Sequence, residues 1–151
     1  MTRLHEELTT RLPIDETFSF IADFANSMHW DPGVATSERI GDAPFGPRAR
    51  YRLGVRMRGN VAPMEYVITT FEPTSRVVLT GEGSNVSAVD DIRFTAVDGG
   101  TRIEYNADIR LTGLLRFVQP FVGGSFEKIA RDAVSGMQRA LDERAAAKAA
   151  S

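Results

Sequence analysis

The feature that most constrains the fold is an apolar stripe near the C-terminus, in the stretch Pro120–Lys148. Its members recur largely at steps of three and four residues: Phe121, Val122, Phe126, Ile129, Ala130, Ala133, Val134, Met137, Ala140 and Leu141. This spacing predicts one amphipathic helix, about 40 Å long at the usual rise per residue. Charged residues fill its other side, so the helix is too polar to span a membrane. It must therefore bury its stripe against another layer of the protein.

That second layer is predicted by strict alternation in the stretch Arg48–Arg58. The apolar residues Ala49, Tyr51, Leu53, Val55 and Met57 alternate with Arg48, Arg50, Arg52, Arg56 and Arg58. A period of two predicts a strand with one face on the core and a basic face in water. The next two residues, Gly59-Asn60, are typical of a two-residue hairpin turn.

This turn predicts a register in which every inward residue of the strand meets an apolar partner. The predicted pairs are Met57 with Ala62, Val55 with Met64, Leu53 with Tyr66, and Tyr51 with Ile68. A second hairpin at Gly99-Gly100 would pair Phe94 with Tyr105 and Ile92 with Ala107. Centring that turn on Asp98-Gly99 changes the partners but keeps the faces.

The remaining segments complete an α+β order, with a first strand ended by Pro13 and then two short helices. We expect Asp15 to cap the first of these, and Phe24–Met28 to form the second. Further strands are expected at Val34–Ile40, at Arg76–Glu82, from Val86 to the second hairpin, and from that hairpin to Leu111. A short helical segment at Leu114–Val118 leads into the last helix. Sequential strands joined by short turns predict an antiparallel sheet with helices on one face.

Composition bounds the class of protein. With 151 residues, one domain over 1–151 is expected. A formal charge of −2 argues against nucleic acid as a partner. The absence of cysteine excludes disulfides and fits a reducing, cytoplasmic compartment, and no secretory leader is visible. The two histidines are far apart and no ligand spacing recurs, so neither a metal nor another cofactor is predicted.

Several motifs occur together in a familiar order. They are Leu12-Pro13-Ile14-Asp15-Glu16-Thr17-Phe18, Trp30-Asp31-Pro32-Gly33, Phe71-Glu72-Pro73 and Gly100-Thr101-Arg102-Ile103-Glu104-Tyr105. With the final helix, they resemble the polyketide cyclase/dehydrase branch of the START-like SRPBCC superfamily over nearly the whole chain. The resemblance implies the helix-grip fold, a seven-stranded antiparallel sheet wrapped around the C-terminal helix with a deep apolar cavity. Members bind lipids, polyketides, sterols or other hydrophobic molecules, and some are cyclases.

The expected cavity lining combines inward strand positions with aromatic residues of the helices. The candidates are Trp30, Tyr51, Leu53, Tyr66, Phe94, Tyr105, Phe117, Phe121, Phe126 and Met137. The three tyrosines can orient carbonyl or hydroxyl groups of a ligand. They can equally be core aromatics whose hydroxyls bond to backbone or water.

Three residues are candidates for acid–base chemistry. Asp90 lies on the inward phase, where burial would raise its pKa, unless it is wet at the strand end. Glu6 has the same two interpretations on the first strand, and His29 is either a proton-transfer group or a solvated surface residue. A cyclase would use one of these as base and a tyrosine as donor to an enolate oxygen.

Three functions therefore remain open from the sequence. The first is binding of a hydrophobic small molecule, such as a lipid or polyketide, and the second is a metal-free cyclase or dehydratase reaction on one. The third is a structural or regulatory partner protein with a vestigial cavity. The outward apolar residues Val61, Pro63, Val67 and Phe71 would then form an oligomer interface, or would lie under a neighbouring element. The sequence leaves monomer and homodimer open.

Overall fold

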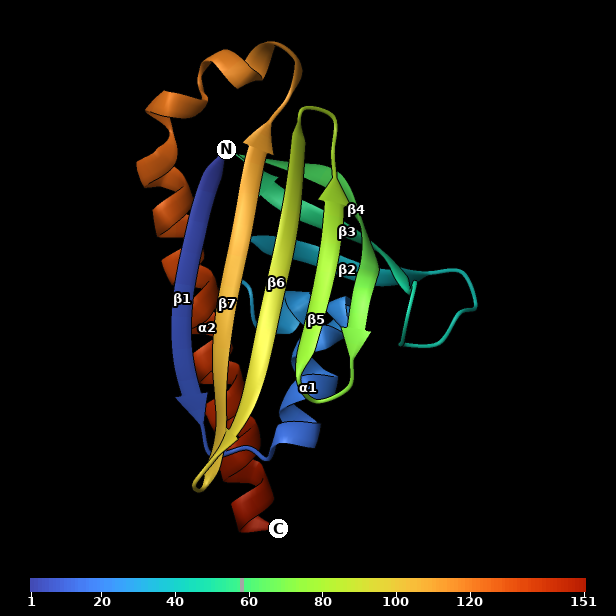
Figure 1. The fold of residues 1–151 in the computed structure, drawn as a ribbon, viewed down its shortest axis with the longest axis vertical. Coiled ribbons are helices and arrows are strands. Elements are labelled where there is room, and N and C mark those ends of the chain that lie inside the picture. The colour runs from blue at the N-terminus through green and yellow to red at the C-terminus, as the bar shows by residue number, and fades with distance from the viewer. Residues whose placement is uncertain (58) are drawn as a thin grey trace.

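One curved antiparallel sheet holds a long C-terminal helix along its concave side (Figure 1). The computed structural model describes residues 1–57 and 59–151. In chain order, the elements are β1 (Thr2–Thr10), α1 (Ile14–Ala22), η1 (Phe24–His29), β2 (Val34–Ile40), β3 (Arg50–Met57), β4 (Asn60–Glu72), β5 (Arg76–Glu82), β6 (Val86–Val97), β7 (Gly100–Leu111), η2 (Gly113–Phe117), η3 (Gln119–Phe121) and α2 (Gly123–Ala150). The sheet order β1-β7-β6-β5-β4-β3-β2 confirms the predicted α+β helix-grip architecture.

The long helix packs on the sheet mainly through the C-terminal half of its apolar stripe. Its buried residues are Gly136, Met137 and Leu141, and the Gln138 side-chain amide donates to the Thr9 carbonyl of β1 at 2.8 Å. The helix begins at Gly123 rather than at Pro120, because the preceding residues form the separate turn η3.

Gln119 holds that separate turn against the sheet. The Gln119 amide nitrogen donates to the Ile109 carbonyl at 2.6 Å, and its oxygen accepts from the Leu111 backbone N–H at 3.0 Å. These bonds satisfy backbone groups at the end of β7, where a buried orphan group would be costly.

The β3–β4 hairpin keeps the predicted faces but not the predicted partners. Tyr51 lies opposite Tyr66 and Val55 opposite Ala62, two residues away from the expected register. Asn60 is the first residue of β4 and pairs with Met57, so the turn is centred one position earlier than expected. Gly59 has the left-handed φ of 82° that such a turn requires, and Arg58 lies outside the described residues. A shift of two positions leaves every side chain on its original face.

The β6–β7 hairpin turns at Asp98-Gly99, the second of the two predicted alternatives. Val97 pairs with Gly100 and Ile92 pairs with Tyr105, so the partners expected from a Gly99-Gly100 turn are wrong. Gly100 instead serves a close approach, since an added Cβ there would lie 1.8 Å from the Thr10 carbonyl oxygen.

A bulge in β4 reverses the expected direction of Phe71. The register passes from Ile68 opposite Leu79 to Thr70 opposite Val78, which leaves Thr69 as an extra residue. Phe71 therefore points inward and stacks on Phe18 of α1, with ring centroids 5.5 Å apart. The prediction that Phe71 faces outward is wrong.

The rest of the predicted outward apolar set differs in exposure from one residue to the next. Val67 is half-buried, whereas Val61 and Pro63 are exposed. The set is therefore no continuous exposed surface.

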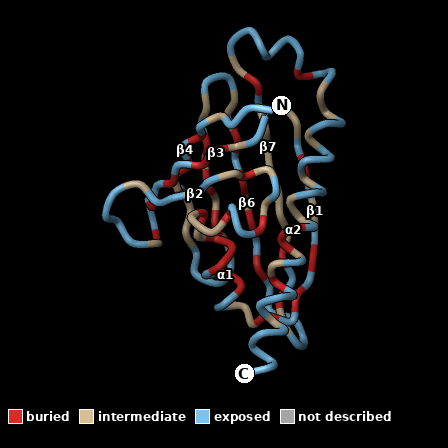
Figure 2. The backbone as a smooth tube through the Cα atoms, turned by 180° about the vertical axis from the view of Figure 1, so that it is seen from behind, coloured by how far each residue is buried: buried red, intermediate tan, exposed pale blue. Residues whose placement is uncertain are grey.

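The short helices close one end of the fold. Pro13, not Asp15, occupies the N-cap of α1, and Asp15 sits in its first turn. The Asp23 side chain caps η1 by accepting from the Ala25 N–H at 3.2 Å. Buried positions gather on the inner side of the sheet and on α1, while the β7–α2 connection is mostly exposed (Figure 2).

Candidate ligand cavity

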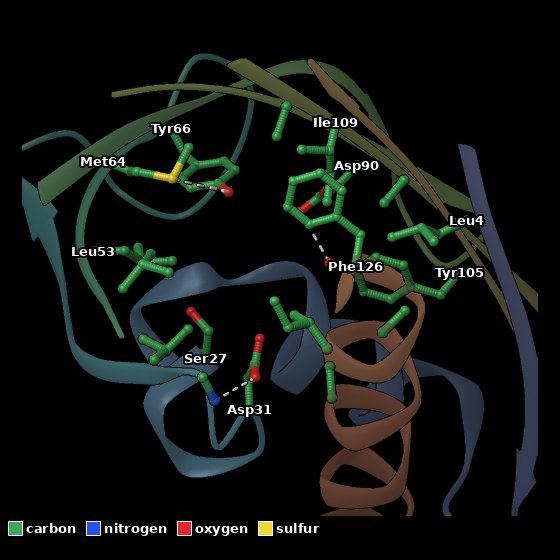
Figure 3. Close-up of a pocket in the computed structure, with 18 of the residues that line it drawn as sticks. Leu4, Ser27, Asp31, Leu53, Met64, Tyr66, Asp90, Tyr105, Ile109 and Phe126 are labelled. Carbon is green, nitrogen blue, oxygen red and sulfur yellow. Dashed lines mark hydrogen bonds between the residues drawn. The ribbon is translucent and has the colours of Figure 1, made fainter. Parts of the chain in front are cut away.

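A cavity of ≈ 190 Å³ lies between the sheet and the N-terminal half of α2 (Figure 3). Most of its wall is apolar. The apolar lining comes from Leu4, Phe24, Trp30, Val34, Leu53, Val55, Met57, Met64, Val86, Ala88, Ala107, Ile109, Phe126, Ile129, Ala130, Ala133 and Val134. Strand alternation places the sheet residues of this list on the concave face, and the helical stripe supplies the opposite wall.

Five of the ten residues predicted to line the cavity do so. They are Trp30, Leu53, Tyr66, Tyr105 and Phe126. Trp30 is buried at the end of η1, and its indole packs edge-on to Tyr105 with centroids 6.2 Å apart.

Three of the other predicted lining residues are packed in the core away from the cavity. Tyr51 is fully buried beside Phe24, at a centroid distance of 6.3 Å. Phe94 packs edge-on against Phe18 at 5.1 Å, and Met137 is fully buried under the C-terminal half of α2.

The last two predicted lining residues lie on the surface. Phe117 and Phe121 belong to η2 and η3 and are 63% and 85% exposed. The predicted helical stripe therefore begins too early in the chain. The long helix begins only at Gly123, after η3, so it includes neither phenylalanine.

Asp90 provides a buried acid within this apolar wall. It is only 6% exposed, and its Oδ2 accepts a hydrogen bond from the Tyr105 hydroxyl at 2.9 Å. Asp90 pairs with Ala107 and Tyr105 pairs with Ile92, so the two side chains are diagonal neighbours on one face. Burial raises the pKa of Asp90 to about 7, against the lowering effect of the Tyr105 hydrogen bond, and the charge of Asp31 raises it further.

Asp31 is a second acid in the cavity wall, and no repeating pattern in the sequence points to it. One carboxylate oxygen accepts from the Gly33 backbone N–H at 2.8 Å. Burial is the main cause that raises the pKa of Asp31, and the Gly33 hydrogen bond opposes it. Asp31 and Asp90 come from opposite sides of the cavity (Figure 3). The Trp30-Asp31-Pro32-Gly33 motif could have drawn attention to Asp31. The motif lies in a loop, however, and no periodic pattern predicts which way a loop side chain points.

Tyr66 owes its position to a glycine on the next strand. Its ring lies over Gly81, where an added Cβ would come within 2.4 Å of the ring. The Tyr66 hydroxyl lies 4.0 Å from the Met64 sulfur, and burial raises the pKa of Tyr66 well above its ordinary value. Tyr66 therefore presents a weakly engaged hydroxyl group at the cavity wall.

The remaining candidates divide between the wall and the surface. Glu6 lines the cavity from β1, opposite Tyr105 in register. His29 is exposed at the end of η1 and does not line the cavity, so its predicted role in proton transfer has no geometric support. Among the described arginines of the alternating stretch, Arg48, Arg50, Arg52 and Arg56 are exposed as predicted, and Arg50 and Arg52 lie beside Glu65 at 3.5 and 3.7 Å. Arg56 reaches the rim, where its Nε donates to the Pro32 carbonyl at 3.1 Å.

One glycine lets α2 close the side of the cavity. A Cβ added to Gly136 would lie 2.0 Å from the Trp30 carbonyl oxygen and 3.0 Å from Pro32 Cδ. The helix backbone therefore touches the loop that carries Trp30 and Asp31. A larger residue at position 136 would force the two elements apart.

Within residues 1–57 and 59–151, no group of three or more histidines and acids is arranged to hold a metal ion. No helix in that part of the chain is long and apolar enough to cross a bilayer.

A curved antiparallel sheet that holds one long helix over an apolar cavity defines a START-like helix-grip fold. The chain belongs to the family described as polyketide cyclase / dehydrase and lipid transport, whose model matches residues 1–148. No match was found among curated proteins.

Solved structures with the same fold include the Zhui aromatase/cyclase from Streptomyces sp. R1128. It is 13% identical, with a TM-score of 0.75, over 95% of this chain and 92% of that one. A START superfamily protein from Mycobacterium smegmatis is 13% identical with a TM-score of 0.73, over 96% and 97% of the two chains. At this identity the likeness shows the fold alone.

Proposed function

We propose that the protein binds a small hydrophobic molecule in the cavity between the sheet and α2. The observation that carries this proposal is a cavity of ≈ 190 Å³ with a mostly apolar wall. Packed cores leave few voids larger than a water molecule, and a dry apolar cavity of about 150 Å³ accepts benzene. The volume therefore suits a compact molecule somewhat larger than one aromatic ring.

A cavity-filling variant tests this proposal. Ala133 lines the cavity from α2, so Ala133→Phe should occupy the site. Ala147→Phe is the matched control, because Ala147 is exposed on the same helix. Native mass spectrometry of gently purified protein, followed by calorimetric titration with propylbenzene, should detect binding to wild type and Ala147→Phe only. Equal binding to Ala133→Phe would place the ligand elsewhere, and no binding to any of the three would end the proposal.

The Asp90–Tyr105 pair supports a second candidate, a cyclase or dehydratase type of reaction. A general base works best with a pKa near the working pH, and the pKa of Asp90 is about 7. The Asp90 carboxylate would take a proton from the carbon beside a ketone, and the Tyr66 hydroxyl would donate to the developing enolate oxygen while the Tyr105 hydroxyl keeps its hydrogen bond to Asp90. Glu6 is a further base in the wall.

Turnover of a model polyketone by three variants tests the enzyme candidate. Asp90→Asn and Tyr105→Phe should each lower the rate at least about tenfold, or ~1.4 kcal/mol in barrier. Tyr51→Phe should leave it unchanged, because Tyr51 does not line the cavity. If wild type binds the compound and never converts it, the binding function stands and the enzyme function falls.

The partner-protein alternative has less support than either. A vestigial cavity would be filled by its own side chains, whereas this cavity measures ≈ 190 Å³. Phe71 also cannot contribute to an outward interface, because it packs inward on Phe18. Light scattering at high protein concentration tests whether the exposed residues Val61 and Pro63 form an oligomer interface. A monomer would remove Val61 and Pro63 as an oligomer interface.

A further inference from the structure

The charges around the cavity are strongly one-sided. The lining residues described include three carboxylates, from Glu6, Asp31 and Asp90, against the single guanidinium of Arg56. That guanidinium is at the rim, exposed and bonded to the Pro32 carbonyl. Among the residues placed by the structure, none of the three acids takes part in an ion pair within 4.0 Å. A buried acid without a cation normally acquires a partner or a proton.

Asp90 is the acid that a ligand would engage. One oxygen is held by Tyr105, and the residue is 6% exposed while lining the cavity. The charged and titratable groups that share the cavity with it are Tyr105, Tyr66, Asp31, Glu6 and the rim Arg56. The cavity-facing residues of α2 are all apolar: Phe126, Ile129, Ala130, Ala133 and Val134.

Aromatic side chains complete the environment of the acids. Trp30, Tyr66, Tyr105 and Phe126 all line the same volume. Ring faces attract cations that lie within about 6 Å of their centroids, and they also accept the flat face of a ligand ring. A wall of this composition attracts a ligand that is apolar at one end and positively charged at the other.

We propose that the cavity selects a small arylalkylamine, whose protonated amine pairs with the Asp90 carboxylate while its ring packs against Trp30 and Phe126. The inference rests on the proposed binding function and adds the charge of the ligand to it. Asp31, on the opposite wall, adds a second negative charge that attracts the ammonium. An anionic ligand of the same size would meet uncompensated like charges in a low-dielectric site, which is a strong basis for rejection.

This selection depends on pH in a defined direction. The amine pairs with the ionised form of Asp90, and burial holds the pKa of that carboxyl at about 7. Amine binding should therefore strengthen as the pH rises through 7, whereas binding of a neutral hydrocarbon should not follow this titration.

Calorimetry with three ligands that share a phenylethyl group tests the inference at pH 8 and pH 5.5. The ligands are phenethylamine, its neutral counterpart propylbenzene, and the anion 3-phenylpropionate. The amine should bind wild type more tightly than the other two at pH 8, and at least about fivefold more weakly at pH 5.5. Asp90→Asn should weaken amine binding at least about tenfold and leave propylbenzene binding intact, which also shows that the variant is folded. Asp31→Asn should weaken amine binding less.

The control variant is Asp108→Asn, which removes the same charge from a residue that does not line the cavity and lies 3.8 Å from Arg3. Its affinity for the amine should equal that of wild type. If propylbenzene binds as tightly as the amine, or Asp90→Asn leaves amine affinity unchanged, the inference falls while the binding function stands. If none of the three ligands binds, both fall together.

Discussion

At the scale of single residues, the buried Asp90 carboxyl couples stability to pH. Its pKa is about 7 in the fold against an ordinary value of 3.8. Between these values the native state holds a proton that the unfolded chain has released, so the free energy of unfolding falls as the pH rises. The slope is at most about 1.4 kcal/mol per pH unit, which gives an upper limit of about 4 kcal/mol over the window.

Asp90→Asn should remove that dependence. We expect the variant to match wild type near pH 4 and to be more stable at pH 8 by up to about 4 kcal/mol. Urea unfolding across this pH range provides the measurement. If the variant is less stable than wild type at pH 8, the ionised Asp90 carboxylate does not destabilise the fold, and this prediction is wrong.

The neighbouring residue Asp91 should behave in the opposite way. Arg76 holds it through two hydrogen bonds of 3.0 and 2.9 Å, and these bonds are the main cause that lowers the pKa of Asp91. Its contribution is present above the ordinary carboxyl pKa and is lost as the pH falls through the lowered value. Asp91→Asn should destabilise the protein at pH 7 by about 1 kcal/mol, as measured by the same urea unfolding. A stabilising effect there would show that the ion pair contributes nothing.

At the scale of elements, two glycines of α2 offer a matched comparison. A Cβ at Gly124 meets nothing within 4 Å, whereas one at Gly136 meets the Trp30 carbonyl oxygen at 2.0 Å. Gly124→Ala should stabilise the helix by about 0.5–1 kcal/mol. Gly136→Ala should destabilise the protein by about 1–3 kcal/mol and weaken propylbenzene binding, because the helix must move away from the loop. Thermal unfolding tests both variants, and equal shifts would refute the close packing at Gly136.

The elements also show what alternation can and cannot predict. Tyr51 and Tyr66 share a face and even a register position, yet only Tyr66 lines the cavity, whereas Tyr51 is fully buried in the packed core. Alternation specifies a face, whereas the cavity also depends on which segments lie above that face. The β4 bulge and the direction of Asp31 depend on one extra residue and on one loop, and neither leaves a periodic signal. The strands, the helix and the inward face of Asp90 were predictable because each follows from a repeating pattern. The burial of Asp90 was not, because alternation does not say how much water reaches the end of a strand.

At the scale of the whole molecule, the two halves of α2 differ in how firmly they are held. The buried residues of the helix begin at Gly136, and the N-terminal half covers the cavity with half-buried or exposed side chains such as Phe126 and Ile129. Backbone amides of 123–135 should therefore exchange with deuterium faster than those of 137–145. Hydrogen exchange read by mass spectrometry tests this, and uniform protection along the helix would contradict it.

The extra residue in β4 also limits how this chain can change over generations. Deleting one residue between Ile68 and Phe71 would turn every later side chain of the strand to the other face. Phe71 would then point outward, and the contact between β4 and α1 that it makes with Phe18 would be lost. Restoring it would take several simultaneous substitutions. In a lineage of such proteins, the number of residues in this segment should therefore change less readily than their identities, and a sequence alignment that opens a gap there should be distrusted.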